Sequence, residues 1–326
     1  MVRAPNHLGD VVAALPALAA DGSDVLVVRA LAPLLRMARL AGEVVPFERG
    51  PAGFVRAVRE LRRRRYREGV LLSPAFSAAW LFRCGGVGRL RGTATDGRSF
   101  LLVERLDPRA LRPYHRIDAY RILLGQEPAG PRAHRIEPPE ELRARWRAAL
   151  PPGRPLVGLF PGANAPARRW PAGRFAALAA ALAARGAGVV VLGGPAERDL
   201  TASVAAAAPG SADLGARTDL ADLAAVLSLC DLVVTNDTGP MHLAGAVGTP
   251  TVSLWGPSDP NEVRQVGAPD VRVSGPELPC KPCRKNRCPR RGPGTRLPDA
   301  HEECMRLIEL AEVLAAVEPA LERSRP

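Results

Sequence analysis

Residues 156–192, LVGLFPGANAPARRWPAGRFAALAAALAARGAGVVVL, place two short apolar runs on either side of a long stretch rich in Ala and Leu. Both runs contain Val and Leu without polar alternation, which is typical of parallel strands buried on both faces. Between them, residues 175–185 repeat apolar side chains at helical spacing. A strand, a helix and a second strand in this order predict a βαβ unit, and therefore an α/β fold with a parallel sheet.

The same alternation extends in both directions from this stretch. Further buried strands are expected at residues 25–28, 70–72, 232–234 and 251–254. Helices are expected at residues 140–150, 198–208, 220–229 and 305 to about 321, and the arginine run 62–65 is expected on the solvated face of a helix that begins at residue 54. Because 326 residues exceed one average domain, we expect two doubly wound, Rossmann-like domains. Proline-rich segments around the charged helix 140–150 place the boundary there, giving domains 1–150 and 151–326.

The net charge of +12 is unevenly divided. Residues 1–150 carry 26 Arg or Lys against 15 Asp or Glu, whereas the remainder carries 19 against 18. A basic first half suits an anionic partner, namely nucleic acid, an anionic membrane face or a phosphorylated acceptor, although bias toward Arg is the alternative. The apolar runs are shorter than the ~20 residues that cross a bilayer, and no signal peptide is recognised, so we expect a soluble, cytoplasmic protein.

Asp10 lies in the first informative loop, Asn6-His7-Leu8-Gly9-Asp10, where a strand gives way to a helix. Such loops lie at the carboxyl end of a parallel sheet, where ligands bind. One interpretation makes Asp10 the N-cap of the helix. The other makes it a general base that removes a proton from an acceptor hydroxyl.

Three further loops are expected at the same kind of edge in the second half. Residues 161–171 contain Asn164 and Arg168, and an arginine can grip a phosphate with a fork of donors; Pro171 is expected at the first position of the following helix. Residues 193–197 end in Glu197, either a dipole partner in a first helical turn or a ribose ligand.

Residues 235–242 place a polar run before an Ala-rich helix. There Thr238 and Gly239 would offer amides at a helix N-terminus, a ready anion site. The alternatives are that Asp237 caps the helix and that His242 is a core histidine. A fourth loop, residues 255–260, follows the next strand.

Four cysteines gather near the end of the chain as Cys280-x2-Cys283-x4-Cys288-x15-Cys304. This spacing fits a structural zinc site, and the alternative is four reduced thiols packed in a loop. We expect these cysteines to be structural and not catalytic.

Together these motifs resemble those of glycosyltransferase family 9, the bacterial ADP-heptose:lipopolysaccharide heptosyltransferases. The resemblance spans nearly the whole chain, and its most specific block is residues 237–244, Asp-Thr-Gly-Pro-Met-His-Leu-Ala. The cysteine segment is similar to that of heptosyltransferase II-type members. The resemblance implies a GT-B fold and an inverting, metal-independent transfer of L-glycero-D-manno-heptose from ADP-heptose to the inner core of lipopolysaccharide.

The resemblance also assigns roles to residues of this chain. Asp10 matches the proposed base, Thr238 and Gly239 the pyrophosphate cradle, Glu197 the ribose ligand, and Asp237 the acid that faces the donor sugar. Arg168 departs from the lysine usual in the family, and we expect it to bind the donor and assist catalysis. We also place Asn164 and His242 in the donor site.

No cofactor is required in this interpretation, and the partners are ADP-heptose, a phosphorylated lipid A-core acceptor and the anionic cytoplasmic face of the inner membrane, reached peripherally. The rivals are a transferase of the same fold that uses another nucleotide sugar, and a basic nucleic-acid-binding protein. Nucleic-acid binders interleave aromatic and basic residues for stacking, and the basic half of this chain has few aromatics.

Overall fold

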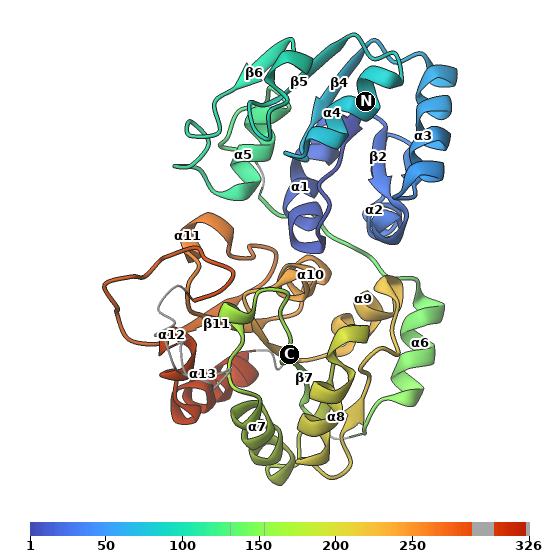
Figure 1. Ribbon diagram of the computed structural model, residues 1–326. Helices are drawn as coiled ribbons and strands as arrows, with labels where there is room; N and C mark the ends of the chain where they lie inside the picture. The colour runs from blue at the N-terminus through green and yellow to red at the C-terminus, as the bar shows by residue number, and fades with distance from the viewer. Residues whose placement is uncertain (131, 153, 289–302, 324–326) are drawn as a thin grey trace. The chain divides into compact units, whose positions relative to one another are not determined.

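The computed structural model describes residues 1–130, 132–152, 154–288 and 303–323, and it divides into two compact units (Figure 1). Unit 1 comprises residues 1–136, and unit 2 begins at Glu137. The division lies earlier than the boundary expected near residue 150, because helix α6 (Glu140–Ala149) packs against α9 (Leu220–Leu229) of unit 2. The indole Nε1 of Trp146 in α6 donates a 3.0 Å hydrogen bond to the carboxylate of Asp222 in α9.

Unit 1 is built on a six-stranded, wholly parallel sheet with the order β3-β2-β1-β4-β5-β6. Its strands are β1 (Val2–Arg3), β2 (Val25–Val28), β3 (Val44–Phe47), β4 (Glu68–Leu71), β5 (Arg89–Thr93) and β6 (Glu104–Leu106). Its helices are α1 (Leu8–Asp21), α2 (Ala32–Met37), α3 (Pro51–Arg64), α4 (Phe76–Cys84) and α5 (Arg116–Leu123), with 3-10 turns η1 (Arg29–Leu31) and η2 (Ser99–Leu101).

Unit 2 repeats the plan with a second six-stranded parallel sheet, in the order β12-β11-β10-β7-β8-β9. Its strands are β7 (Leu156–Phe160), β8 (Gly188–Val191), β9 (Ala212–Asp213), β10 (Leu232–Asn236), β11 (Thr251–Trp255) and β12 (Asp270–Ser274). Besides α6 and α9, its helices are α7 (Ala172–Ala184), α8 (Arg198–Ala206), α10 (Gly239–Val247), α11 (Pro260–Val263), α12 (Glu303–Arg306) and α13 (Leu310–Arg323), with 3-10 turns η3 (Pro166–Arg168) and η4 (Pro195–Glu197).

In both units the first strand is central, and the strand order is that of the Rossmann fold, 3-2-1-4-5-6. The expected doubly wound α/β architecture is therefore confirmed. The order reverses beside β1 in unit 1 and beside β7 in unit 2, so each sheet has one switch point at which neighbouring loops part to opposite sides.

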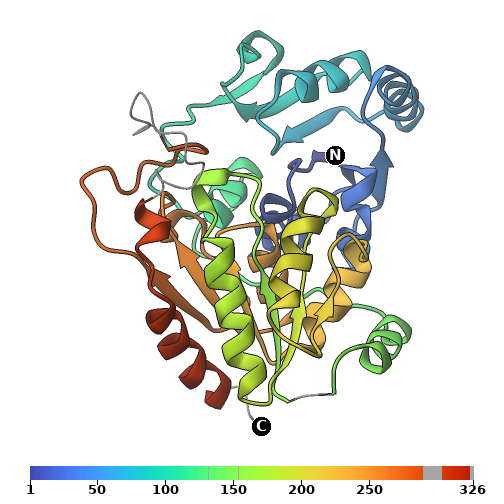
Figure 2. The ribbon, with the colours of Figure 1, turned by 60° about the horizontal axis from the view of Figure 1, so that its bottom comes forward.

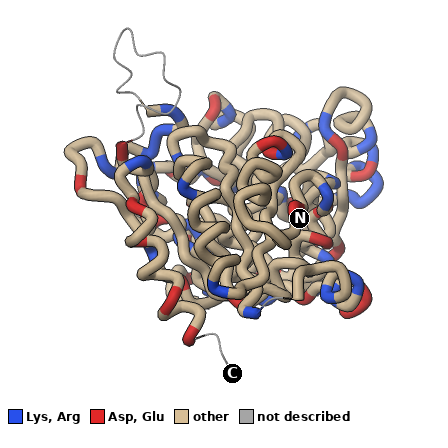
Figure 3. The backbone as a smooth tube through the Cα atoms, turned by 90° about the horizontal axis from the view of Figure 1, so that it is seen from below, with Lys and Arg blue, Asp and Glu red and all other residues tan. Residues whose placement is uncertain are grey.

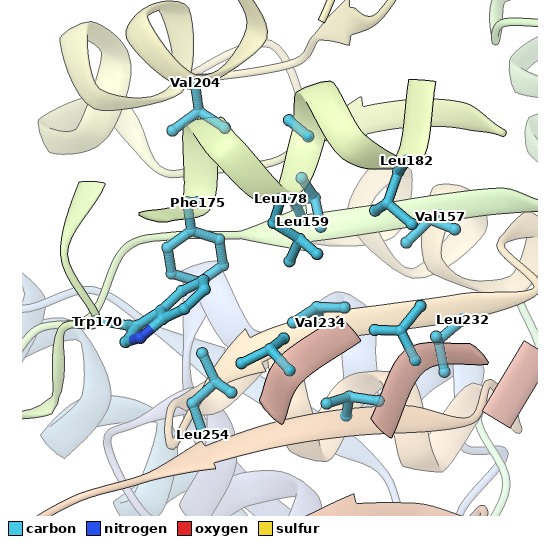
Figure 4. Close-up of a cluster of buried hydrophobic side chains, with 14 of the residues drawn as sticks. Val157, Leu159, Trp170, Phe175, Leu178, Leu182, Val204, Leu232, Val234 and Leu254 are labelled. Atoms are coloured by element: carbon cyan, nitrogen blue, oxygen red, sulfur yellow. The ribbon is translucent and has the colours of Figure 1, made fainter. Parts of the chain in front are cut away.

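The core of unit 2 lies between one face of its sheet and helices α7, α8 and α13. Figure 2 shows α7 and α13 lying over the strands. Trp170 and Phe175 meet edge to face with ring centroids 5.0 Å apart, and both are buried against Leu159 and Leu254 (Figure 4). This packing fixes the start of α7, and with it the loop that follows β7.

Two helix ends and the exposure of one arginine differ from expectation. Pro171 is the N-cap of α7, so the first helical position belongs to Ala172. The terminal helix is interrupted between α12 and α13, where the carbonyl of Ile308 accepts a 2.9 Å hydrogen bond from the Trp170 indole instead of continuing a helix. In α3, Arg64 is only 16% exposed because Glu43 and Glu60 bind it, so the arginine run is not wholly solvated.

Acidic and basic residues are interspersed along the backbone in Figure 3, and the arginines of α3 have nearby carboxylates. Within the described ranges, no helix is both long enough and apolar enough to span a membrane.

Candidate functional site

The candidate donor site lies at the carboxyl edge of the unit 2 sheet. Strands β7 and β10 are neighbours at the switch point, and β8 and β11 flank them. Because all four strands are parallel, the loops that follow them emerge at one edge. These are the four loops that the sequence predicted to lie together.

Arg168 and Asp237 meet across the switch point. Nη1 of Arg168, at the end of η3 after β7, lies 3.2 Å from Oδ2 of Asp237, which follows β10. The Asp237 side chain is 4% exposed and that of Arg168 is 31% exposed. Nε of Arg168 and Oδ2 of Asp237 are both buried, and neither makes a hydrogen bond within the described part of the chain. Each of these two buried atoms therefore keeps an unused hydrogen-bonding position.

Asn236 is a site residue that the sequence analysis did not single out. It ends β10 fully buried, and its Oδ1 accepts a 3.0 Å hydrogen bond from the amide of Trp170. Its Nδ2 donates to the carbonyl of Pro161 at 2.8 Å. Asn236 thus hydrogen-bonds the loop after β7 on both sides of Arg168, at Pro161 and at Trp170. The signal in the sequence is an amide side chain two residues after the apolar residues 232–234.

Glu197 connects the loops after β7 and β8. Its Oε2 accepts a 2.8 Å hydrogen bond from the amide of Gly194, as a first-turn acid would. Its carboxylate also lies against Gly162, where a Cβ atom would come within 1.7 Å of Oε1. A side chain at position 162 would therefore displace the carboxylate from its place in the structure. The position of Glu197 in a first helical turn is therefore present in the structure, and its role in ribose binding stays a prediction.

Thr238 is the N-cap of α10, and Gly239 is the first helical residue. Asp237 precedes the cap, so the alternative that Asp237 itself caps the helix is wrong. The hydroxyl of Thr238 makes no capping hydrogen bond in the portion that the structure describes. The amides of Thr238 and Gly239, at the positive end of the α10 dipole, thus follow Asp237 directly in the chain. His242 lies half-buried at the end of the first turn, and Asn164 is exposed in the loop after β7.

The fourth loop is braced by the cysteine-bearing segment. Arg284 contacts Asp259 at 3.3 Å and Glu262 at 2.6 Å, and its amide donates to the carbonyl of Pro257 at 2.8 Å. Two residues later, the carbonyl of Asn286 accepts a 3.2 Å hydrogen bond from the amide of Ala167, the neighbour of Arg168. One short segment thus touches the loops after both β7 and β11.

Asp10 lies in unit 1, at the corresponding edge of that sheet. Helix α1 begins at Leu8 with His7 as N-cap, so Asp10 is the third helical residue and the expectation that it caps the helix is wrong. Its Oδ1 lies 3.5 Å from Nη1 of Arg116. Burial raises the pKa of Tyr120 well above its ordinary value, and the nearby Asp10 carboxylate adds to the shift. Arg116 and Tyr120, both on α5, are the neighbours that orient Asp10.

Comparison with known proteins identifies the family of this chain. Residues 54–292 match the model of glycosyltransferase family 9 (heptosyltransferase), which is more than half of the chain. The chain belongs to glycosyltransferase family 9.

Two curated relatives of this family 9 chain are heptosyltransferases. Lipooligosaccharide heptosyltransferase 2 of Haemophilus influenzae is 35% identical over 120 residues, which is 35% of each chain. Lipopolysaccharide heptosyltransferase 1 of Pseudomonas aeruginosa is 30% identical over 230 residues, covering 65% of this chain and 60% of the relative. The first of these matches therefore spans about a third of the relative's length, and the second about three fifths.

The family 9 fold itself is matched along the whole chain. The structure of Escherichia coli ADP-heptose lps heptosyltransferase II superposes with a TM-score of 0.80 at 22% identity, covering 99% of this chain and 98% of the other. An Escherichia coli heptosyltransferase with ADP gives 0.65 at 18% identity, covering 83% and 93%. These matches confirm the GT-B fold expected from the sequence.

The family 9 chain carries its cysteines as free thiols. Among the described residues, no group of three or more His, Cys, Asp or Glu side chains is placed to hold a metal ion. Burial raises the pKa of Cys304 to about 11, and the thiols of Cys280, Cys283 and Cys288 add to the shift. All four cysteines are partly buried, and a zinc site at them stays a prediction.

Proposed function

We propose that this chain is an inverting, metal-independent glycosyltransferase that moves L-glycero-D-manno-heptose from ADP-heptose to the inner core of lipopolysaccharide. The observation that carries the proposal is the Arg168–Asp237 pair beside the N-terminus of α10, at the switch point of a Rossmann-like sheet. The curated relatives, which are named as lipopolysaccharide or lipooligosaccharide heptosyltransferases, support the choice of sugar and acceptor.

In this proposal unit 2 holds the donor. The guanidinium of Arg168, the hydroxyl of Thr238 and the amides of Thr238 and Gly239 bind the pyrophosphate, because these are a cation and donors at the positive end of a helix dipole. Asp237 accepts hydrogen bonds from the hydroxyls of the donor heptose, and Glu197 accepts from the ribose. Asn164 and His242 line the same edge.

Unit 1 holds the acceptor. Asp10 takes the proton from an acceptor hydroxyl as its oxygen attacks the anomeric carbon on the face opposite ADP. The new carbon–oxygen bond forms while the bond to the pyrophosphate breaks, and the negative charge on the leaving ADP is stabilised by Arg168 and the amides of Thr238 and Gly239. The net charge of +11 in residues 1–150 suits a phosphorylated lipid A-core acceptor and peripheral association with the anionic cytoplasmic face of the inner membrane.

A panel of nucleotide sugars tests the proposal. A ligand that binds only the folded state at 100 times its Kd stabilises it by about 2.7 kcal/mol. We therefore expect the Tm to rise with ADP and ADP-heptose, and not with UDP-, GDP- or CMP-sugars. Transfer is then followed by mass spectrometry of a core acceptor incubated with ADP-heptose. Stabilisation by another nucleotide sugar alone would assign a different donor, and stabilisation by oligonucleotides alone would contradict a transferase.

A further inference from the structure

Unit 1 carries a cluster of aromatic side chains on its surface. The rings of Phe76 and Trp80, one turn apart on α4, stack with centroids 6.4 Å apart, and Phe100 of η2 lies 6.2 Å from Phe76. Trp80 is 47% exposed and Phe100 is 68% exposed. Of the six large hydrophobic residues exposed in the described ranges, four lie between residues 80 and 114, namely Trp80, Phe100, Val103 and Tyr114. We call Phe76, Trp80 and Phe100 the aromatic patch.

Two arginines flank the aromatic patch without a carboxylate partner in the described part of the chain. Nε of Arg83 donates to the carbonyl of Leu101 at 2.8 Å, and Nε of Arg105 donates to the carbonyl of Leu102 at 3.4 Å. Both carbonyls belong to residues within two positions of Phe100, and Nη1 of Arg83 also donates to the carbonyl of Gly88. In contrast, Arg91 on the adjacent strand β5 is paired with Glu104 at 2.9 Å.

One carboxylate also adjoins the aromatic patch. Oδ2 of Asp96 accepts a 2.6 Å hydrogen bond from the amide of Phe76, at the first turn of α4. It is therefore used within the fold, where an acid near a helix N-terminus is stabilising. The patch keeps two cations against this one anion.

The aromatic patch is rigidly mounted at the edge of the sheet where Asp10 lies. The buried guanidinium of Arg98 donates to the carbonyls of Ser73, Ala75 and Thr93 at 2.6, 3.2 and 3.0 Å, which ties the loops after β4 and β5 together. Asn6, in the loop that leads into α1, donates to the hydroxyl of Ser73 at 3.3 Å. The patch and the helix that carries Asp10 thus share one set of loops.

We propose that the aromatic patch, with Arg83 and Arg105, docks this protein on an anionic lipid surface. Tryptophan and phenylalanine gain by entering the boundary between headgroups and acyl chains, and arginine pairs with the headgroup phosphates. Exposed apolar rings beside uncompensated cations fit such a surface better than they fit water or a protein partner of ordinary polarity. This inference rests on the proposed function in one respect, because a lipid-linked acceptor is what such docking would bring to Asp10.

Trp80 is a built-in probe for this docking. It is the only tryptophan of unit 1, and Trp170 and Trp255 of unit 2 are fully buried. Trp146 is half-buried, and W146F removes its background. We expect the Trp80 emission of W146F to shift to the blue and to be quenched by brominated acyl chains when phosphatidylglycerol vesicles are added. Pure phosphatidylcholine vesicles should give neither effect at physiological salt.

Variants separate the two parts of the patch. In vesicle co-sedimentation, W80S/F100S should lose most binding, and R83Q and R105Q should each lower the partition coefficient about fivefold, the equivalent of ~1 kcal/mol per basic residue, with a weaker salt dependence. V55S is the matched control, because Val55 is 46% exposed on α3, outside the aromatic patch. It should bind as the wild type does.

Three results would overturn the inference. The first two are vesicle binding by W80S/F100S equal to that of wild type, and a loss of vesicle binding in V55S as large as that in W80S/F100S. The third is a shift of Trp80 emission that appears without lipid when the protein concentration is raised. R83Q and R105Q keep the test valid if W80S/F100S proves unstable by circular dichroism. The vesicles contain no acceptor, and transfer to a lipid-free core oligosaccharide should be unchanged in the patch variants. If the wild-type protein binds vesicles but transfers no heptose, that result would therefore contradict the proposed function alone.

Discussion

The guanidinium of Arg168 lies 3.2 Å from the buried carboxylate of Asp237, which joins the loops after the two central strands of the unit 2 sheet. The pair brings a cation and an anion from positions 69 residues apart to the start of α10. Each member can be changed alone, and the two changes should have different effects on the binding of ADP.

Replacing Arg168 with alanine should weaken ADP binding. A hydrogen bond to a charged group contributes about 1.5–3 kcal/mol, which is roughly a 10- to 150-fold change in Kd. Isothermal titration with ADP measures it. Arg185→Ala is the matched control, because Arg185 is an exposed arginine just beyond the other end of α7. Equal affinities of Arg168→Ala and wild type would show that Arg168 does not bind phosphate.

Asp237→Asn should act in the opposite direction on ADP. Removing the negative charge beside Arg168 frees its guanidinium, so ADP should bind as tightly as to wild type or more tightly. Transfer from ADP-heptose should fall by about tenfold or more, since a charged acceptor for the sugar hydroxyls is lost. Titration and a transfer assay on the same preparation check both. A parallel loss of ADP affinity would mean that Asp237 serves the nucleotide and not the sugar.

Asp10→Asn should abolish most transfer with little effect on folding. General-base catalysis contributes about 10²- to 10⁴-fold in rate. The half-exposed contact with Arg116 contributes at most about 1 kcal/mol, and the interaction with the α1 dipole a similar amount. We therefore expect a Tm close to that of wild type, unchanged ADP affinity and a collapse in kcat. Transfer within a few fold of wild type would remove Asp10 from the reaction.

Arg284→Ala should raise the KM for the donor more than it lowers kcat. The side chain holds Asp259 and Glu262, and the chain from Arg284 to Asn286 reaches Ala167 beside Arg168. Without these ion pairs the loop after β7 loses part of its support. The double exchange Arg284→Glu with Glu262→Arg should restore much of the donor affinity. If Arg284→Ala leaves the KM unchanged, the cysteine segment does not support the donor loop.

The thiols of Cys230 and Cys304 should react with iodoacetamide only at high pH. Burial raises the pKa of Cys230 to about 12 and is the main reason why that of Cys304 is about 11. Because the thiolate is the nucleophile, alkylation of Cys304 should accelerate roughly 100-fold between pH 8 and pH 10, against only a few fold for a reference thiol of pKa about 8.5. Peptide mass spectrometry follows each site, and circular dichroism confirms that the protein stays folded. A rate for Cys304 that follows the reference thiol would show that its pKa is not raised.

The sequence predicted β2 of unit 1 and the central strands of unit 2 because these are mostly buried and therefore appear as short apolar runs. The residues expected for β2, β7, β10 and β11 all lie within the observed strands. Strand β5, with the sequence RLRGT, and the edge strands β6 and β12, with ERL and DVRVS, were not predicted. Their polar residues lie in solvent, in ion pairs or, for Asp270, in hydrogen bonds from the hydroxyls of Thr251 and Ser253, so these strands lack the pattern of a buried strand.

The parts of the candidate site that strand topology determines were predictable from the sequence. Loops that follow neighbouring parallel strands must emerge together, so Arg168 and Asp237 could be placed at one edge from sequence alone. The partners that come from elsewhere in the chain could not. Arg116 approaches Asp10 from α5, and Asn286 approaches Ala167 from the cysteine segment. Such contacts depend on how helices and long loops pack, and the local sequence pattern does not record them.

The core of unit 2 joins the first strand of that unit to the last helix of the chain, since Val157 of β7 and Val313 of α13 belong to one buried cluster. A chain is synthesised from its N-terminus, and domains generally fold in that order. All strands and helices of unit 1 precede residue 137, so unit 1 can fold while the rest is still being translated. Unit 2 must wait for α13, and Trp170 must wait for Ile308. A newly made molecule therefore completes the support of its Arg168 loop last.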